Sequence, residues 1–99
     1  MATLAYSRRA LDDLLRLTAF LYKDDAQSGL VTIGLIQEAL AILKDHPLVG
    51  HKAGAGPVRE LVISRGRSGY LAQYAYDPEA NVVLVLAIRH QREAGYEET

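Results

Sequence analysis

One short segment of the chain concentrates the side chains that could carry out chemistry. It reads Arg89-His90-Gln91-Arg92-Glu93, and Tyr96 follows three residues later. An imidazole can act as a general acid or base, and a guanidinium can hold a phosphate through two parallel hydrogen bonds. Arg89, His90, Arg92 and Tyr96 could therefore act together on a phosphodiester bond. The alternative is structural: the charged residues solvate the end of a strand and His90 forms a local hydrogen bond.

The element that must position this segment comes directly before it. Residues 82–88 are all apolar, and glycine, proline and charge are absent from them. A short apolar run of this kind predicts a strand that is buried on both faces and lies away from the sheet edge. A buried strand with polar groups at its end is a common way to build a site on a rigid element.

Composition excludes several classes of protein. The chain has 99 residues, a net charge of -1 and no cysteine. This length predicts a single domain, residues 1–99. Without thiolates, and with three histidines that lack metal-binding spacing, we expect no metal and no cofactor. Near-neutral charge argues against a protein that grips nucleic-acid phosphates. No run approaches the roughly 20 apolar residues of a membrane span, and a signal peptide is not evident, so we expect a cytoplasmic protein.

Hydrophobic periodicity predicts the remaining elements. Apolar residues recur at three- and four-residue spacing over residues 7–23, and again from about residue 26 until Pro47 ends the pattern, so both segments are predicted helices. Strands are predicted at residues 2–6, 58–64, 70–77 and 82–88, and the Gly- and Pro-rich residues 46–57 are predicted to be a connector. The order β-α-α-β-β-β predicts an α+β fold, in which a helical hairpin packs on one face of a small antiparallel sheet.

Alternation within the strands separates two sheet faces. We expect the helices to cover the face that carries Leu61, Ile63, Tyr70 and Tyr74. The opposite face is mixed in character, and its apolar centre suggests cover by a partner; it carries Glu60, Val62, Ser64, Leu71, Gln73 and Ala75. We further expect Gly34 to mark a close approach of the two helices.

These pieces together resemble the RelE/ParE superfamily of bacterial type II toxins. The resemblance extends over almost the whole chain and rests on the order of several short motifs. They are Ala26, Ala39-Leu40 with Leu43, Pro47-Leu48-Val49-Gly50, Val58-Arg59-Glu60-Leu61, Ser68-Gly69-Tyr70 with Gln73-Tyr74, and the run from Val83 to Arg92. The resemblance implies a plasmid-stabilisation type of toxin that inhibits growth and is neutralised by a cognate antitoxin. DNA would be contacted only indirectly, through the antitoxin.

Members of this superfamily differ in their targets. RelE-like members cleave mRNA on the ribosome with lysines on the strand before the Ser-Gly-Tyr turn and an arginine after that tyrosine. Here the corresponding residues are Glu60, Val62 and Leu71, so the charge that holds the phosphate is missing. ParE-like members inhibit DNA gyrase and often end the last strand as Ile88-Arg89-His90 does. The resemblance therefore favours the ParE-like branch, with no catalytic residues expected.

Two alternatives remain open. One is a RelE-like mRNA endoribonuclease that acts through Arg89, His90, Arg92 and Tyr96. The other is an inactive protein that binds its antitoxin and acts as a co-repressor. Under any of these hypotheses the candidate residues for binding the target or the antitoxin are Arg59, Glu60, Val62, Leu71, Gln73, Arg89, His90 and Arg92.

Overall fold

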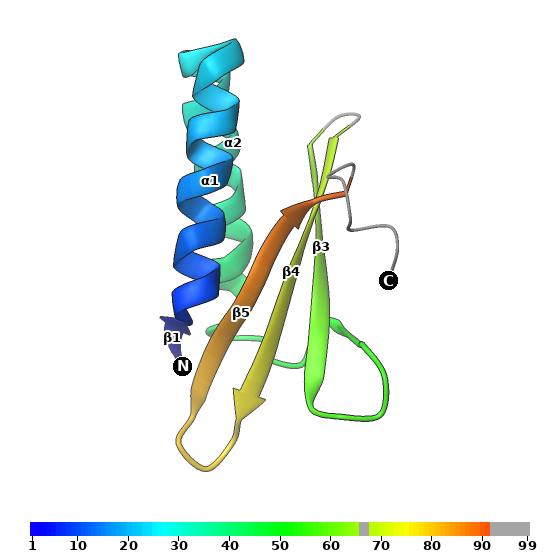
Figure 1. Ribbon diagram of the computed structural model, residues 1–99. Coiled ribbons are helices and arrows are strands. Elements are labelled where there is room, and N and C mark those ends of the chain that lie inside the picture. The colour runs from blue at the N-terminus through cyan, green and yellow to red at the C-terminus, as the bar shows by residue number, and fades with distance from the viewer. Residues whose placement is uncertain (66–67, 92–99) are drawn as a thin grey trace.

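The computed structural model describes residues 1–65 and 68–91, which form two helices and five strands (Figure 1). The helices lie side by side as one layer beside a twisted sheet. In chain order the elements are β1 (Thr3–Tyr6), α1 (Arg8–Asp24), α2 (Ala26–Ile42), β2 (His51–Lys52), β3 (Val58–Arg65), β4 (Ser68–Asp77) and β5 (Val82–His90). The predicted α+β fold, with a helical hairpin beside a small sheet, is confirmed.

The sheet differs from the prediction in two details. Its strand order is β1-β5-β4-β3-β2, and β1 pairs with β5 in parallel, so the sheet is mixed and not wholly antiparallel. Strands joined by short turns must run antiparallel. Because β1 and β5 are separated by most of the chain, this constraint does not apply to them, and they can pair in parallel. The second detail is β2, which pairs with β3 inside the predicted connector. Two residues are too few to show a strand period.

β5 occupies an interior position in the sheet, between β1 and β4, as predicted. Val83, Val85 and Ile88 are fully buried, whereas the side chain of Leu84 is exposed. The expectation of burial on both faces is therefore wrong for Leu84. Both helices lie on the same side of the sheet, and the other side is open along this part of β5.

The inner face of the sheet forms the core with the helices. Register places Leu61 opposite Ala72 and Ile63 opposite Tyr70 across β3 and β4, so these side chains share one face. They belong to one cluster with helix residues, which confirms the predicted assignment of the faces. Its buried members are Ala2, Ala10, Leu17, Ile36, Leu40, Leu43, Ile63, Tyr70, Ala72, Tyr74, Val83, Val85 and Ile88.

A single residue, Asp25, joins the two helices. Its backbone N–H donates to the Leu21 carbonyl at the end of α1, and its carboxylate accepts from the Gln27 N–H and the Ser28 hydroxyl at the start of α2. The side-chain hydrogen bond from Ser28, followed by backbone hydrogen bonds from Ser28 and Gln27, lowers the pKa of Asp25. The carboxylate thereby caps α2 and turns the chain sharply enough to make a hairpin.

The close approach of the helices lies at Gly29 and not at Gly34. A Cβ atom at Gly29 would come within 2.7 Å of the Tyr22 ring. At Gly34, by contrast, no described atom outside the local helix backbone would lie within 4 Å of an added Cβ. Residue spacing could not decide between the two glycines, because both fall at helical positions compatible with the interface.

This contrast predicts opposite responses to alanine. Gly34→Ala should raise the free energy of unfolding by about 1 kcal/mol, because alanine is the better helix former and the position is open. Gly29→Ala should give no such gain, since its methyl group would have to displace the Tyr22 ring. Urea unfolding of the two variants beside the wild type measures both effects. Equal stabilisation by the two substitutions would contradict the assignment.

Candidate functional site

A β-bulge in β5 decides which side chains reach each face at the end of this strand. Tyr74 of β4 lies opposite Val85, but the preceding residue, Gln73, lies opposite Ala87. Leu86 therefore has no directly opposite residue on β4 and reverses the alternation that follows it. As a result Ile88 points into the core, and Arg89 is on the open face opposite Leu71.

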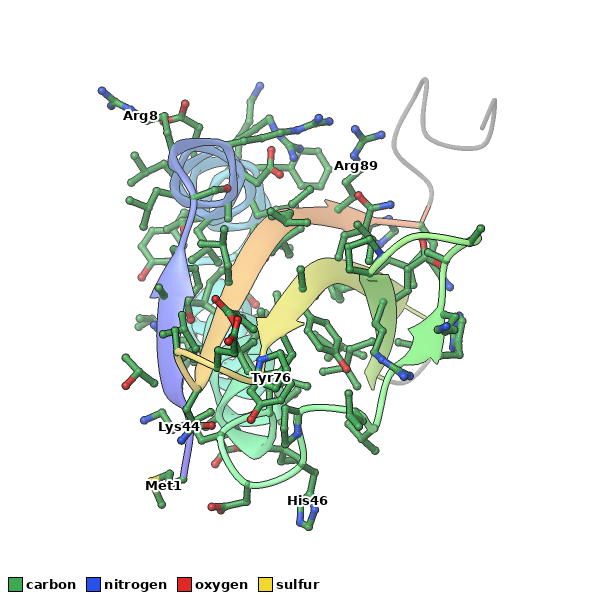
Figure 2. The ribbon with its side chains drawn as sticks, turned by 90° about the horizontal axis from the view of Figure 1, so that it is seen from below. Met1, Arg8, Lys44, His46, Tyr76 and Arg89 are labelled. Carbon is green, nitrogen blue, oxygen red and sulfur yellow. The ribbon has the colours of Figure 1, made fainter. Side chains whose placement is uncertain are left out.

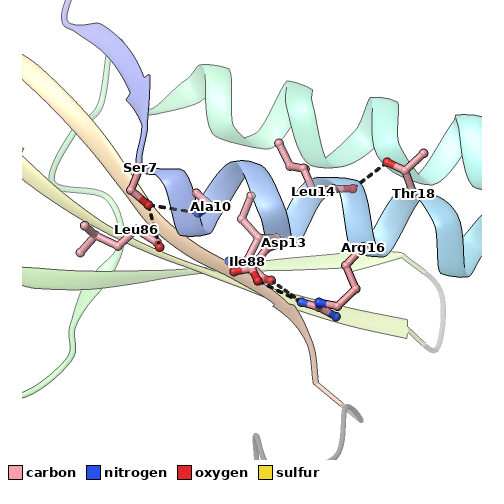
Figure 3. A network of polar contacts seen from close by, with 8 residues as sticks. All are labelled: Ser7, Ala10, Asp13, Leu14, Arg16, Thr18, Leu86 and Ile88. Carbon is pink, nitrogen blue, oxygen red and sulfur yellow. Dashed lines mark hydrogen bonds and ion pairs between the residues drawn. The ribbon is translucent and has the colours of Figure 1, made fainter.

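Side chains from the start of α1 hold the bulged part of β5 (Figure 3). β1 ends at Tyr6, so it does not extend to the end of β5. The Ser7 hydroxyl donates to the Leu86 carbonyl at 3.0 Å and also caps α1 by accepting from the Ala10 N–H. After Ser7, α1 covers the edge of β5 with one acidic and one basic side chain, Asp13 and Arg16.

The Asp13–Arg16 pair takes the place of a neighbouring strand at Ile88. Asp13 Oδ2 accepts the Ile88 N–H at 2.9 Å, and Arg16 Nη2 donates to the Ile88 carbonyl at 3.4 Å. The two side chains also form an ion pair at 3.2 Å. Asp13 is among the buried polar residues, although the Arg16 side chain is partly exposed. A buried N–H without an acceptor is costly, so the carboxylate has a clear structural reason to lie there.

Arg89 and His90 lie on opposite faces of the sheet. Arg89 projects outward from the end of β5 (Figure 2), and register places it on the open face. His90 pairs with Tyr70 on the inner face, and the two rings meet edge to face with centroids 5.0 Å apart. Arg92 and Tyr96 lie outside the residues that the structure describes. The structure therefore separates Arg89 from His90, the two described members of the predicted chemical cluster.

The open face beside Arg89 has a mixed, weakly charged surface. Val62 and Leu71 are cross-strand partners there, and the Val62 side chain is 48% exposed. Next to them Glu60 is opposite Gln73, whose amide donates to the Glu60 carboxylate at 3.2 Å. These four predicted binding residues thus lie together with Arg89 on one face.

Two further residues depart from the predicted picture. Arg59 is on the inner face, and its guanidinium donates to the carbonyls of Leu48 and Gly50, so it anchors the connector. His51 was not predicted, yet its imidazole lies 3.5 Å from the Glu60 carboxylate and extends the polar row to β2. The sequence carried no signal for His51, because only the pairing of β2 with β3 brings it to the open face.

Within residues 1–65 and 68–91, no group of three His, Asp or Glu side chains is arranged to hold a metal ion. Neither of the helices described is long and apolar enough to cross a membrane. A second shift in acidity is at Tyr6, where burial raises the pKa of the phenol. The described part of the open face thus offers apolar contact, hydrogen bonds and the Arg89 guanidinium, which suit binding to a macromolecular surface.

Comparison with known proteins yields a family match and several similar folds. Residues 4–95 match the profile of the family described as "ParE toxin of type II toxin-antitoxin system, parDE". Among solved structures, the chromosomal ParDE system from P. aeruginosa is similar with a TM-score of 0.76 and 19% identity, covering 91% of this chain and 96% of that one. No curated protein sequence matches the chain.

RelE-type structures are also similar. The intact RelBE toxin-antitoxin complex of E. coli gives a TM-score of 0.63 at 18% identity, covering 90% of this chain and 95% of that one. The RelBE2 complex of Mycobacterium tuberculosis gives a TM-score of 0.60 at 22% identity, covering 90% and 96%. At these identities the structural likeness establishes the fold, whereas the family assignment comes from the sequence profile.

Proposed function

Because the chain belongs to the family of ParE toxins of type II toxin-antitoxin systems, we propose that it arrests growth by inhibiting DNA gyrase. The target would bind on the open sheet face, around Val62, Leu71 and Arg89. A cognate antitoxin would neutralise the toxin in the cytoplasm, and DNA would be reached only through that antitoxin.

The observation that favours a protein target is the Val62–Leu71 pair. In RelE-like nucleases the resemblance places phosphate-holding cations at the positions of Glu60, Val62 and Leu71. Here register gathers an acid and two apolar side chains on that same surface. Removing one donor that stabilises transition-state charge commonly costs about 10²–10³ in rate, so a surface that lacks three cations is poorly suited to cleaving RNA.

An exposed apolar surface on α2 supports the proposal that the chain binds an antitoxin. Leu30 is 61% exposed, Val31 49% and Leu35 37%, and they surround a shallow groove over Gly34. We call Leu30, Val31, Gly34 and Leu35 the α2 groove. Exposed apolar patches of this kind mark sites of protein association. The ParDE and RelBE structures with similar folds are toxin-antitoxin systems, which suggests that an amphipathic antitoxin helix fills the groove.

Two assays run in parallel test the proposed target. Purified toxin should inhibit supercoiling by gyrase in vitro, and cellular mRNAs mapped by their 5′ ends should remain intact after toxin induction. Arg89→Ala should weaken the inhibition of supercoiling. Arg9 is an exposed arginine at the start of α1, and Arg9→Ala should leave the inhibition unchanged. The matched pair removes the same charge from two different surfaces.

The competing functions predict other results. Codon-phased mRNA cleavage that disappears in His90→Ala, with supercoiling unaffected, would replace the gyrase proposal with the nuclease. Neither effect, together with stable antitoxin binding, would indicate the inactive co-repressor. Coexpression with the antitoxin should give a complex that stays intact at micromolar concentration, because obligate partners usually bury more than about 2,000 Å².

A further inference from the structure

We propose that Asp13 is a positioning residue for the toxic activity: with Arg16 it holds the bulged end of β5 and so keeps Arg89 on the open face. The inference rests on the proposed function only in placing the target on that face. Ser7 supports the same strand one step earlier, through the Leu86 carbonyl.

The alternation of the strand shows what the bulge changes. Val83 and Val85 point inward, so an unbroken strand would also send residues 87 and 89 inward and residue 88 outward. The extra residue, Leu86, reverses this order. Without it Arg89 would face the core opposite the buried side of β4, and Ile88 would be exposed to solvent. The presence of Arg89 on the open face is thus a property of the bulge.

The edge contacts show what maintains the bulge. β4 pairs with the end of β5 along one side, through a ladder that the bulge weakens, and β1 has already ended. On the other side the partners are the Ser7 hydroxyl, the Asp13 carboxylate and the Arg16 guanidinium. Asp13 makes the shortest of these three contacts and satisfies a buried N–H. Its loss should therefore loosen Ile88, and with it the adjacent Arg89, while the rest of the core cluster stays intact.

The test uses four variants and two readouts. Asp13→Ala removes the acceptor, and Asp13→Asn retains an oxygen that can accept the Ile88 N–H. Asp12→Ala removes the same charge from the exposed neighbouring position. Tyr74→Phe removes a different buried hydrogen bond, from the Gly50 N–H to the Tyr74 hydroxyl, and keeps the ring that lies beside the bulge. The readouts are amide hydrogen exchange at Ile88 and growth inhibition at matched toxin levels in the absence of antitoxin.

For Asp13→Ala we expect exchange at Ile88 to quicken by about tenfold or more, since a hydrogen bond to a charged group contributes roughly that factor. Growth inhibition should weaken by a comparable factor. Asp13→Asn should recover part of both losses, because it keeps a neutral acceptor for the Ile88 N–H but loses the ion pair with Arg16. Asp12→Ala should leave both unchanged. Tyr74→Phe lowers the overall stability, so it can quicken exchange, but it should leave growth inhibition unchanged. Growth inhibition does not depend on which target is correct, so failure of the gyrase assay alone would overturn the proposed function and not this inference.

Three results would overturn the inference. Unchanged exchange at Ile88 in Asp13→Ala would show that the carboxylate does not hold the strand. Faster exchange with undiminished growth inhibition would show that the held geometry is irrelevant to toxicity. An equal loss of toxicity in Tyr74→Phe would reduce the effect to general stability. If Asp13→Ala fails to fold, Arg16→Met replaces it as the test. This variant keeps the apolar stem of the side chain and removes the donor to the Ile88 carbonyl. Undiminished growth inhibition by Arg16→Met would then overturn the inference.

Discussion

Replacing Tyr74 with alanine should lower the free energy of unfolding by about 3–5 kcal/mol, as expected when a large buried aromatic side chain is truncated. Tyr74 is fully buried in the core cluster, and its hydroxyl accepts the Gly50 N–H at 2.9 Å. The substitution therefore opens a cavity and also leaves a buried donor without its acceptor. Because a typical domain has only about 5–15 kcal/mol of stability, we expect this variant to lose a large share of its stability.

Tyr74→Phe is the matched control, because it removes the hydroxyl and keeps the ring. It should cost about 1–2 kcal/mol, the penalty for one buried donor that loses its partner. Urea unfolding of the toxin separated from its antitoxin measures both variants. If the two variants lost the same amount, the hydroxyl and not the packing of the ring would dominate at this position, contrary to our expectation.

The double substitution Val31→Asp with Leu35→Asp should weaken antitoxin binding by about 100-fold or more. Each side chain lies in the α2 groove, and a tenfold weaker affinity for each corresponds to about 1.4 kcal/mol, which is within the range for an anchor residue of an interface. Burying two new carboxylates under the antitoxin would add to the cost. The stability of the free toxin should change little, because both side chains are substantially exposed without the antitoxin.

Lys52→Asp on β2 serves as the control for charge. It changes the net charge by the same two units, from an exposed position outside the α2 groove. Titration calorimetry with the purified antitoxin compares the two variants, and growth of cells that coexpress antitoxin provides the cellular readout. Wild-type affinity in the double variant would show that the antitoxin docks elsewhere. A comparable loss in Lys52→Asp would show that long-range charge dominates the association.

The sequence was informative wherever a regular period extended over many residues. Two helices, the three strands of the meander and the two faces of the sheet followed from spacing alone, because a period of 3.6 or 2 determines which side chains share a face. The break at Asp25 was also predictable, since it interrupts the apolar stripe of the first helix. The resemblance to RelE/ParE toxins led to the same fold and family.

Local interruptions of the pattern were beyond prediction. Leu86 is one apolar residue in an apolar run, so its residue type does not predict a bulge. The bulge at Leu86 nevertheless determines the orientation of both Arg89 and His90. In the sequence, Asp13 and Arg16 look like ordinary surface charges of a helix. Their partner, the edge of β5, belongs to the other end of the chain, so the local sequence does not predict the contact. His51 and the inward position of Arg59 likewise depend on a two-residue pairing that has no period. The sequence therefore predicted the strands that carry the candidate site, but it did not determine which of their side chains share a face.

The parallel pairing of β1 with β5 has a consequence for how the toxin matures. The Ser7 hydroxyl and the Leu86 carbonyl that it contacts are 79 residues apart in the chain, and the neighbouring β1–β5 register spans a similar distance. Contacts this distant must overcome a large loop-closure entropy and slow folding. During synthesis the helical hairpin can form early, but β1 has no partner until β5 has been made. If the antitoxin binds the α2 groove as we propose, the hairpin would be available to it before the open face exists, and neutralisation would precede toxicity along the folding pathway.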